Sequence, residues 1–174
     1  MIEIPLILIG GGYSCIEIKE LINDINKINE KQFIKIIGIL DDKKKTNTKI
    51  NGFNIIGKIK DIKKYKNEKI FVNIFDRNNR FIRPKIIEKL NINSSRFFSI
   101  IHPNNLLGKK IKIGVGVSIY PGCNIFSNSK IGNFCNIMPN VSIASNTTVI
   151  DNCFIGKDVL IGAGSKIKKN VYIS

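Results

Sequence analysis

The fold of this chain is decided by stretches such as Ile131-Gly132-Asn133-Phe134-Cys135-Asn136-Ile137, in which a branched aliphatic residue returns at every sixth position. On both sides of this stretch the same period continues without a gap, through Ile113, Ile119, Ile125, Ile131, Ile137, Ile143, Val149, Ile155, Ile161, Ile167 and Ile173. A period of six matches neither an amphipathic helix nor a flat two-sided strand. It predicts a parallel β-helix, in which each coil buries its apolar face by stacking on the next.

Two further columns run through the same repeat. Small or β-branched residues precede the aliphatic positions by two, at Val117, Cys123, Ser129, Cys135, Val141, Thr147, Cys153, Val159, Ser165 and Val171. Between them stand residues that tolerate positive φ, with Phe134 the one exception: Gly116, Gly122, Asn128, Asn140, Asn146, Asn152, Asp158, Gly164 and Asn170. We therefore expect a short strand and a tight corner in each block. Three blocks would complete a triangular coil, with residues eighteen apart stacked about 4.8 Å from each other.

The bulk composition narrows the possible partners. No run of 18 apolar residues is present, so we expect no membrane span, and the start of the chain reads as a buried strand rather than a signal peptide. Four cysteines without CxxC or histidine partners favour a reduced, cytoplasmic protein with neither disulfide nor metal. The net charge of +15 is almost wholly dispersed lysine, accompanied by abundant Ile and Asn. We expect no nucleic-acid partner, but some attraction for phosphate-bearing small molecules.

The first hundred residues follow a different pattern. An apolar run at 4–9 enters Gly10-Gly11-Gly12-Tyr13-Ser14, and residues 15–28 then carry apolar side chains at helical spacing. A strand, a glycine turn and a helix form a phosphate-binding arrangement in many nucleotide-binding domains. The fingerprint is incomplete, because its third glycine would fall at Cys15. A tight turn without a ligand is the alternative.

Carboxylates follow two of the other expected strands. The strand at 34–40 ends in Asp41-Asp42, and the strand at 69–74 is followed by Phe75-Asp76. A carboxylate at the end of the second strand of such a unit commonly meets a ribose or a base. We therefore take the glycine turn with Tyr13 and Ser14, together with Asp41, Asp42, Phe75 and Asp76, as a candidate nucleotide-sugar site. Short helices are expected at 60–65 and 80–90.

Four motifs in this order resemble a known family, the bacterial hexapeptide-repeat acetyltransferases that act on nucleotide sugars of the pilin-sugar and sialic-acid type. They are Gly10–Tyr13, Leu40-Asp41-Asp42, Ile50–Gly57 and Ile101-His102-Pro103. The resemblance implies a Rossmann-like domain at 1–100 that holds the nucleotide sugar. It also implies a left-handed β-helix at 101–174, which forms a homotrimer and binds acetyl-CoA as co-substrate. Gly156, Gly162, Ala163 and Gly164 are the positions that the resemblance assigns to acetyl-CoA.

Two departures from the family pattern concern the chemistry. The family places a histidine followed by an acid in one hexapeptide, and the gapless alignment puts Ser145 and Asn146 on those positions. The chain's one histidine, His102, falls in the junction motif, where a structural role is expected. The β-helix also reaches its Ile161-Gly162-Ala163-Gly164 block earlier than family members do, so this domain reads as shortened.

A general base contributes about 10²–10⁴-fold to such a transfer, so its loss affects a hydroxyl nucleophile more than an amine. We therefore expect transfer of an acetyl group to the amine of a nucleotide-linked amino sugar, in surface polysaccharide or glycan biosynthesis. Asp151 is a candidate weak proton acceptor beside Ser145 and Asn146. The alternative is a non-catalytic trimeric relative that keeps the nucleotide site.

Overall fold

A computed structural model describes residues 1–75 and 80–174 of the chain, which divide into two compact units, Met1–Phe98 and Ser99–Ser174. Each unit has its own hydrophobic core. Within the described residues, no helix is both long enough and apolar enough to cross a bilayer.

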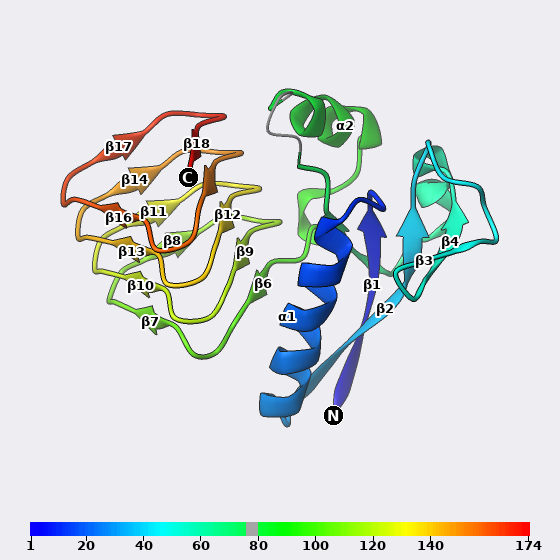
Figure 1. Cartoon of the computed structure of the whole chain (residues 1–174), viewed down its shortest axis with the longest axis horizontal. Coiled ribbons are helices and arrows are strands. Elements are labelled where there is room, and N and C mark those ends of the chain that lie inside the picture. The colour runs from blue at the N-terminus through cyan, green and yellow to red at the C-terminus, as the bar shows by residue number, and fades with distance from the viewer. Residues whose placement is uncertain (76–79) are drawn as a thin grey trace. The chain divides into compact units, whose positions relative to one another are not determined.

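The first unit is built on a five-stranded sheet in the order β3-β4-β2-β1-β5. Figure 1 labels its strands β1 to β4. The strands are β1 (Ile2–Ile9), β2 (Gln32–Leu40), β3 (Lys49–Ile50), β4 (Phe53–Gly57) and β5 (Lys69–Val72). All neighbours are parallel except β3, which pairs with β4 in antiparallel fashion. The continuous apolar run Leu6–Ile9 is fully buried, as expected for a central parallel strand.

Helices connect these strands. The helix α1 (Ser14–Ile28) buries Cys15, Ile18, Leu21, Ile22 and Ile25. The helical spacing predicts this face except at Ile16, which it also includes but which is 42% exposed, while Cys15 takes its place in the core. A 3₁₀ helix (Ile59–Lys64) follows β4, α2 (Ile82–Leu90) follows β5, and a short 3₁₀ turn (Ser94–Arg96) precedes the second unit. The strands β2 and β5 lie on opposite sides of β1, so the side of the sheet on which strands are added switches at β1. The carboxyl ends of parallel strands at such a point usually form the ligand crevice of an α/β sheet.

The second unit is a left-handed parallel β-helix with three faces, which confirms the expected fold class. The first face holds β6 (Ile100–Ile101), β9 (Ser118–Ile119), β12 (Asn136–Ile137), β15 (Phe154–Ile155) and β18 (Tyr172–Ile173). The second face holds β7 (Leu106–Leu107), β10 (Asn124–Ile125), β13 (Ser142–Ile143) and β16 (Leu160–Ile161). The third face holds β8 (Lys112–Ile113), β11 (Lys130–Ile131), β14 (Thr148–Val149) and β17 (Lys166–Ile167).

Every strand of the prism pairs with the strand eighteen residues away, as the three-block coil predicts. Ile125 pairs with Ile143, Ile131 with Val149 and Ile137 with Ile155. The aliphatic column points inward and forms a continuous buried core from Ile119 to Ile161. Stacked coils of this kind contact only their neighbours, so the core is a column rather than a globule.

The corners adopt the conformation that their residue types predict. Positive φ is found at all ten corner positions from Gly116 to Asn170, including Phe134 at 55°. Lys110, at 58°, extends the column by one block toward the N-terminus. Asparagine and aspartate side chains link the same corner of adjacent coils, as in the bonds from Asn140 Nδ2 to Asp158 Oδ1 (3.1 Å) and from Asn152 Nδ2 to Asn170 Oδ1 (2.7 Å).

The column of small residues has a hydrogen-bonding role as well as a steric one. Five of its six thiols and hydroxyls can donate to the carbonyl fifteen residues later: Cys123 to Met138, Ser129 to Ala144, Cys135 to Ile150, Thr147 to Gly162 and Cys153 to Lys168. The sixth, Ser165, donates to the Gly162 carbonyl. All four cysteines are free and buried. Burial raises the pKa of the Cys123 thiol, which keeps it protonated as a donor.

Candidate functional site

The glycine turn after β1 lies against the loop after β5. Gly10 has φ 101°, and a Cβ there would fall 2.4 Å from Ile74 Cγ1 and 3.1 Å from the Asn73 carbonyl oxygen. Only glycine allows both this backbone conformation and this close approach. Gly12 is exposed, and a Cβ there would meet no atom within 4 Å. The turn is therefore tight at its first glycine and open at its third.

The side chain of Asp41 is hydrogen-bonded to Gly11, the middle glycine of the turn. Its Oδ2 accepts the Gly11 N–H at 2.7 Å, and its Oδ1 accepts the N–H groups of Lys43 (2.7 Å) and Lys44 (3.2 Å). The amide that would face a phosphate in a dinucleotide-binding turn is thus already bonded to a carboxylate. A phosphate at this point would meet negative charge, whereas a ribose hydroxyl or a nucleobase N–H would find an acceptor.

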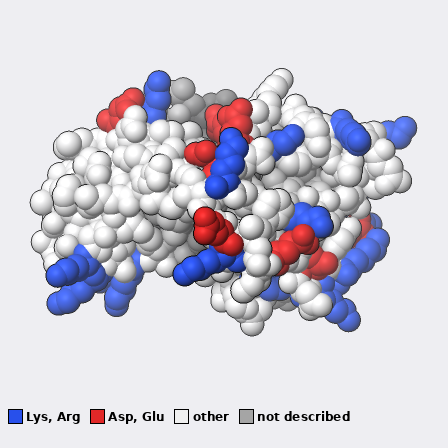
Figure 2. Space-filling view, turned by 90° about the horizontal axis from the view of Figure 1, so that it is seen from below, with Lys and Arg blue, Asp and Glu red and all other residues white. Residues whose placement is uncertain are grey.

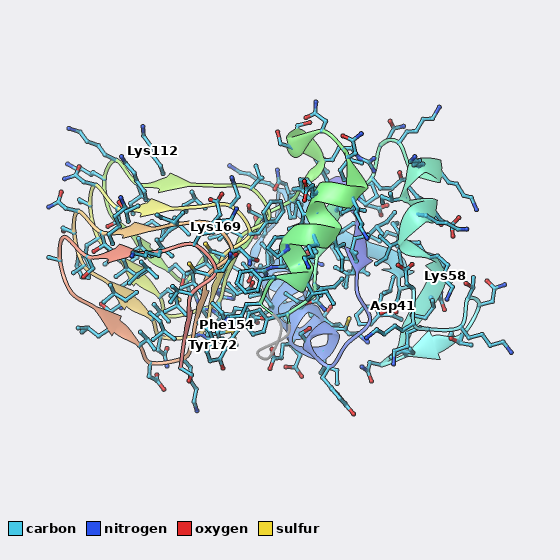
Figure 3. All side chains as sticks on the ribbon, turned by 90° about the horizontal axis from the view of Figure 1, so that it is seen from above. Asp41, Lys58, Lys112, Phe154, Lys169 and Tyr172 are labelled. Atoms are coloured by element: carbon cyan, nitrogen blue, oxygen red, sulfur yellow. The ribbon has the colours of Figure 1, made fainter. Side chains whose placement is uncertain are left out.

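Lys58 holds the loop that carries Asp41 and Asp42 (Figure 3). Its ammonium group donates to the carbonyl oxygens of Asp42 (2.9 Å) and Lys44 (2.8 Å), and Asp42 Oδ1 accepts the Ile59 N–H at 2.9 Å. The predicted carboxylates therefore lie on a loop that is fixed from two sides. Sequence reasoning missed Lys58, because it lies in a lysine-rich segment without a distinguishing pattern.

A buried polar group lies under the glycine turn. The Cys15 thiol donates to the Gly10 carbonyl (3.1 Å) and accepts from Asn73 Nδ2 (3.1 Å), and Ser14 Oγ lies 3.5 Å from the Asn73 carbonyl oxygen. Burial raises the pKa of Cys15 to about 11, against the smaller lowering effect of the Asn73 bond; Asp41 adds a further raising effect. Cys15 therefore supports the turn as a neutral thiol in place of the third glycine of the fingerprint.

The remaining predicted residues of this site differ in their surroundings. The side chain of Tyr13 is 91% exposed at the start of α1. Phe75 is half-buried, with the Arg83 guanidinium 5.9 Å from its ring centroid, a cation–π distance. Asp76 lies outside the described residues. The structure thus brings Gly10, Gly11, Ser14 and Asp41 together at the carboxyl edge of the sheet, where sequence reasoning expected them.

Ser145 and Asn146 lie at the corner between the second and third faces of the β-helix. Asn146 has φ 60° and is exposed, and its Oδ1 accepts from Asn128 Nδ2 at 3.2 Å. The Ser145 carbonyl accepts the Gly164 N–H from the next coil at 3.0 Å. Among the described residues, no imidazole or carboxylate bonds either side chain. This corner can therefore accept or donate hydrogen bonds, but it offers no general base.

Asp151 belongs to the following corner, between the third and first faces. Its Oδ1 accepts the Asn133 N–H at 2.8 Å, and a Cβ on Gly132 would fall 2.4 Å from that oxygen. The strand β14 separates Asp151 from Ser145. The structure does not bring the three predicted catalytic residues into one cluster.

The small residues that the resemblance assigns to acetyl-CoA lie at two different corners of the β-helix. Gly162, Ala163 and Gly164 are exposed directly above the Ser145 corner, and a Cβ on Gly164 would meet no atom within 4 Å. Gly156 is buried by the first face, where a Cβ would fall 2.9 Å from the Ile173 carbonyl oxygen. Only the first three therefore leave open surface beside Ser145 and Asn146.

His102 has the surroundings of a structural residue. Its side chain is 1% exposed, its Nδ1 accepts the Asn104 N–H at 3.1 Å, and its backbone N–H bonds the Ile119 carbonyl at 2.9 Å. It lies at the corner between the first and second faces, not at the Ser145 corner. Among the described residues, no group of three His, Cys, Asp or Glu side chains could hold a metal ion.

Comparison with known proteins fits this architecture. Residues 5–90 match the family described as the PglD N-terminal domain. This match confirms, for the first unit, the resemblance that the sequence motifs indicated. No curated protein sequence matches the chain significantly.

Solved structures share the fold of nearly the whole chain. The acetyltransferase domain of PglB from Neisseria gonorrhoeae, in complex with acetyl coenzyme A, is 20% identical, with 94% of this chain and 92% of that chain covered and a TM-score of 0.55. A histidine-to-alanine mutant of GDP-perosamine N-acetyltransferase from Caulobacter crescentus, in complex with CoA and GDP-perosamine, is 18% identical, covering 97% and 90%, with a TM-score of 0.59. WeeI from Acinetobacter baumannii is 18% identical, covering 99% and 92%, with a TM-score of 0.58. At these identities the likeness shows the fold.

Proposed function

We propose that this protein is an acyltransferase that moves an acetyl group from acetyl-CoA to the amine of a nucleotide-linked amino sugar, in glycan biosynthesis. The match to the PglD N-terminal domain supports a nucleotide-sugar partner for the first unit. The shared fold with proteins in complex with acetyl coenzyme A or with CoA and GDP-perosamine supports the two substrate classes.

One observation carries the choice of an amine as nucleophile. The corner that aligns with the family's catalytic block holds Ser145 and Asn146, and no described side chain there can take a proton. A sugar hydroxyl must lose its proton as it attacks a thioester, so it needs a base. An amine attacks through its free base and can release its proton afterwards to water. The open surface at Gly162–Gly164 is where we place the thioester end of acetyl-CoA.

The nucleotide end of the acceptor is assigned to the carboxyl edge of the first unit's sheet. We propose that Asp41 accepts hydrogen bonds from the ribose or the base, since its carboxylate already satisfies Gly11 and would repel a phosphate. Asp42, Gly12, Tyr13 and Ser14 border this position. Phe75 offers a partly exposed ring on which a base could stack.

Restoring the missing base tests the chemical proposal. The variant Ser145→His with Asn146→Asp should raise kcat/KM for acetyl transfer to amino-sugar nucleotides by about 10²-fold or more, the range of general-base assistance. Aspartate is chosen over glutamate because position 146 has φ 60°, which aspartate tolerates better. Ser145→Ala is the matched control and should change the rate less than threefold.

The competing possibility is a non-catalytic relative that keeps the nucleotide site, which the lack of a base at Ser145 also favours. The two are separated by turnover of acetyl-CoA with UDP-, dTDP- and GDP-linked amino sugars. Absence of turnover in both the wild type and the His/Asp variant, together with absence of acetyl-CoA binding, would favour the non-catalytic relative. A tenfold loss on Ser145→Ala would contradict our account of the serine.

We further propose that the protein is a homotrimer joined through uncharged faces of its prisms. The second face presents Leu106, Phe126 and Leu160, exposed by 52%, 41% and 77%, and has no charged residue in its strands. Exposed apolar patches of this kind often mark association sites. Phe126→Glu should convert the trimer to monomer in light scattering, whereas Lys130→Glu on the third face should not. A monomeric wild type at micromolar concentration would refute the assembly.

A further inference from the structure

Charge is distributed very unevenly over the β-helix. Of the eight lysines at residues 99–174, seven lie on the third face or at the two corners that bound it: Lys109, Lys110, Lys112, Lys130, Lys166, Lys168 and Lys169. Residues 99–174 contain only two carboxylate side chains, Asp151 and Asp158. Asp158 lies at the corner between the first and second faces, away from the third face. In Figure 2, much of the visible surface of this unit is uncharged, and lysine side chains project together from one edge. A lysine-rich composition alone would distribute lysines over all three faces of the β-helix.

The lysines of this face are stacked on one another rather than paired with acids. Lys112 and Lys130 are direct partners in the ladder between β8 and β11, and Thr148 and Lys166 continue the same column. Like charges opposite each other in a ladder are unfavourable. Within the described part of the chain, none of these lysines forms a salt bridge. An anion between Lys112 and Lys130 would relieve the repulsion.

A groove runs beside this column. It has a volume of about 340 Å³ and is lined by Lys112, Ile113, Gly114, Lys130, Ile131, Gly132, Thr148, Val149, Ile150 and Asp151. That volume lies at the lower end of the range for small-molecule sites. The side chain of Lys112, which lines the groove, points outward from the β-helix (Figure 3). Its lining combines two lysines with glycine and aliphatic residues, and it includes one carboxylate, that of Asp151.

Two of the residues that line the groove are glycines that the close stacking of the coils requires. A Cβ on Gly114 would fall 2.5 Å from Asn133 Oδ1, and one on Gly132 would fall 2.4 Å from Asp151 Oδ1. Those two side chains are themselves fixed, since Asn133 Oδ1 accepts the Val115 N–H at 3.0 Å and Asp151 Oδ1 accepts the Asn133 N–H at 2.8 Å. The groove is therefore a fixed feature of the stacked coils.

We propose that this groove binds the diphosphate group of a nucleotide-type ligand, with Lys112 and Lys130 as cationic contacts and the Thr148 hydroxyl as a donor. The inference deepens the proposed function and rests on it for the carrier, by which we mean the molecule to which the diphosphate belongs. Both substrates of the proposed reaction, CoA and a nucleotide sugar, contain a diphosphate. The Asp151 carboxylate also lines the groove and would repel a phosphate placed against it, so the phosphates are assigned to Lys112 and Lys130.

The chemistry of the face favours a small diphosphate over nucleic acid. Single strands bind through aromatic platforms as well as cations. The outward positions of β8, β11, β14 and β17 are Lys112, Lys130, Thr148 and Lys166, without an aromatic ring among them. A 340 Å³ groove fits a compact anion.

Titration with inorganic pyrophosphate tests the site directly. The variant Lys112→Gln/Lys130→Gln should bind pyrophosphate at least tenfold more weakly than the wild type by calorimetry. The control Lys31→Gln/Lys157→Gln removes two exposed lysines elsewhere and should change the affinity less than twofold. Thermal unfolding of each variant checks that the fold is intact; we expect the face variant to be at least as stable as the wild type, because a like-charge pair is removed.

CoA and UDP, titrated into the same variants, identify the carrier. Selective weakening of CoA assigns the groove to the acyl donor, and selective weakening of UDP assigns it to the sugar nucleotide. Absence of pyrophosphate binding to the wild type, or an equal effect of the two double variants, would overturn the inference. Pyrophosphate binding that depends on Lys112 and Lys130 in a protein without acetyl transfer would leave the groove standing and reject the proposed function.

Discussion

The two units of this chain differ in how far along the sequence their side-chain hydrogen bonds reach. In the β-helix the separations repeat, with fifteen residues between Cys123 and Met138 and eighteen between Asn133 and Asp151. Around the glycine turn of the first unit the bonds span 30 residues from Gly11 to Asp41 and 58 from Asn73 to Cys15. One unit is assembled by a rule that repeats, and the other by contacts that each occur once.

This difference predicts different responses to damage. In a stacked prism each coil depends on the coils above and below it, so a defect spreads along the column. In the α/β unit, a defect at the sheet edge removes one set of bonds and leaves the apolar strands Leu6–Ile9 buried. The following predictions are ordered from the largest expected effect to the smallest.

An unpaired charge in the aliphatic column should be the most damaging change. Ile143→Asp places a carboxylate where exposure is 0% and should lower the unfolding free energy of the β-helix by about 3–5 kcal/mol. Thr148→Asp, at an outward position of the third face, is the control and should cost less than about 1 kcal/mol. Urea unfolding followed by circular dichroism measures both. Equal effects would contradict the inward direction of the column.

Removal of the Asp41 carboxylate should weaken the first unit less. Asp41→Ala leaves the N–H groups of Gly11, Lys43 and Lys44 without their acceptor, at a cost of about 2–3 kcal/mol. It should also abolish binding of sugar nucleotides in calorimetry. Glu20→Ala removes an exposed carboxylate of α1 and should change neither quantity. Unaltered nucleotide binding by Asp41→Ala would move the nucleotide away from this edge.

Alkaline pH should weaken the first unit through Cys15. Its pKa is raised from 9.0 to about 11 by burial, so the thiol is neutral in both states below pH 9, whereas between pH 9 and 11 only the unfolded chain ionises. Stability is thus lost as pH rises through this window, by about 2 kcal/mol at most. Cys15→Ser keeps a hydroxyl at the site, and its unfolding free energy should fall less between pH 8 and 10.5. Identical pH dependence would exclude this role of the thiol.

The smallest effect is expected on the first face of the prism. Phe154 and Tyr172 stack with their ring centroids 4.9 Å apart and their planes 11° from parallel. Tyr172→Ala should cost about 1 kcal/mol, the usual value of such a pair, and Tyr172→Phe, which keeps the stacked ring, should cost less. Thermal unfolding of the two variants tests whether the stack or the hydroxyl matters.

The sequence predicted the β-helix to the level of single residues because one period determines which side chains point inward and where the chain turns. Even Phe134, the one corner residue without a preference for positive φ, adopts φ 55°. The ladder on both sides fixes the strands, so the residue between them must follow. The place of Ser145 and Asn146 at a corner of the prism follows from the same alignment of blocks.

What the sequence could not predict depends on contacts that each occur once. The glycine turn was interpreted as a phosphate site, but the bond from Gly11 to Asp41 shows that its central amide has an internal partner. The tether from Lys58 to the carbonyls of Asp42 and Lys44 uses a lysine that resembles its many neighbours. The groove of the third face required the folding of three blocks into one coil, because only then do lysines eighteen residues apart gather on a single surface.

The eighteen-residue register constrains how this molecule can change by insertion or deletion. Gain or loss of eighteen residues adds or removes one whole coil and leaves every later side chain on its original face. Gain or loss of six residues also preserves the inward aliphatic column, so the prism can still close, but each later residue moves to the next face. Lys130 would then leave the line of Lys112, and the Ser145 corner would rotate away from the surface it now borders. A short indel could thus exchange the chemistry of the faces while leaving the core intact.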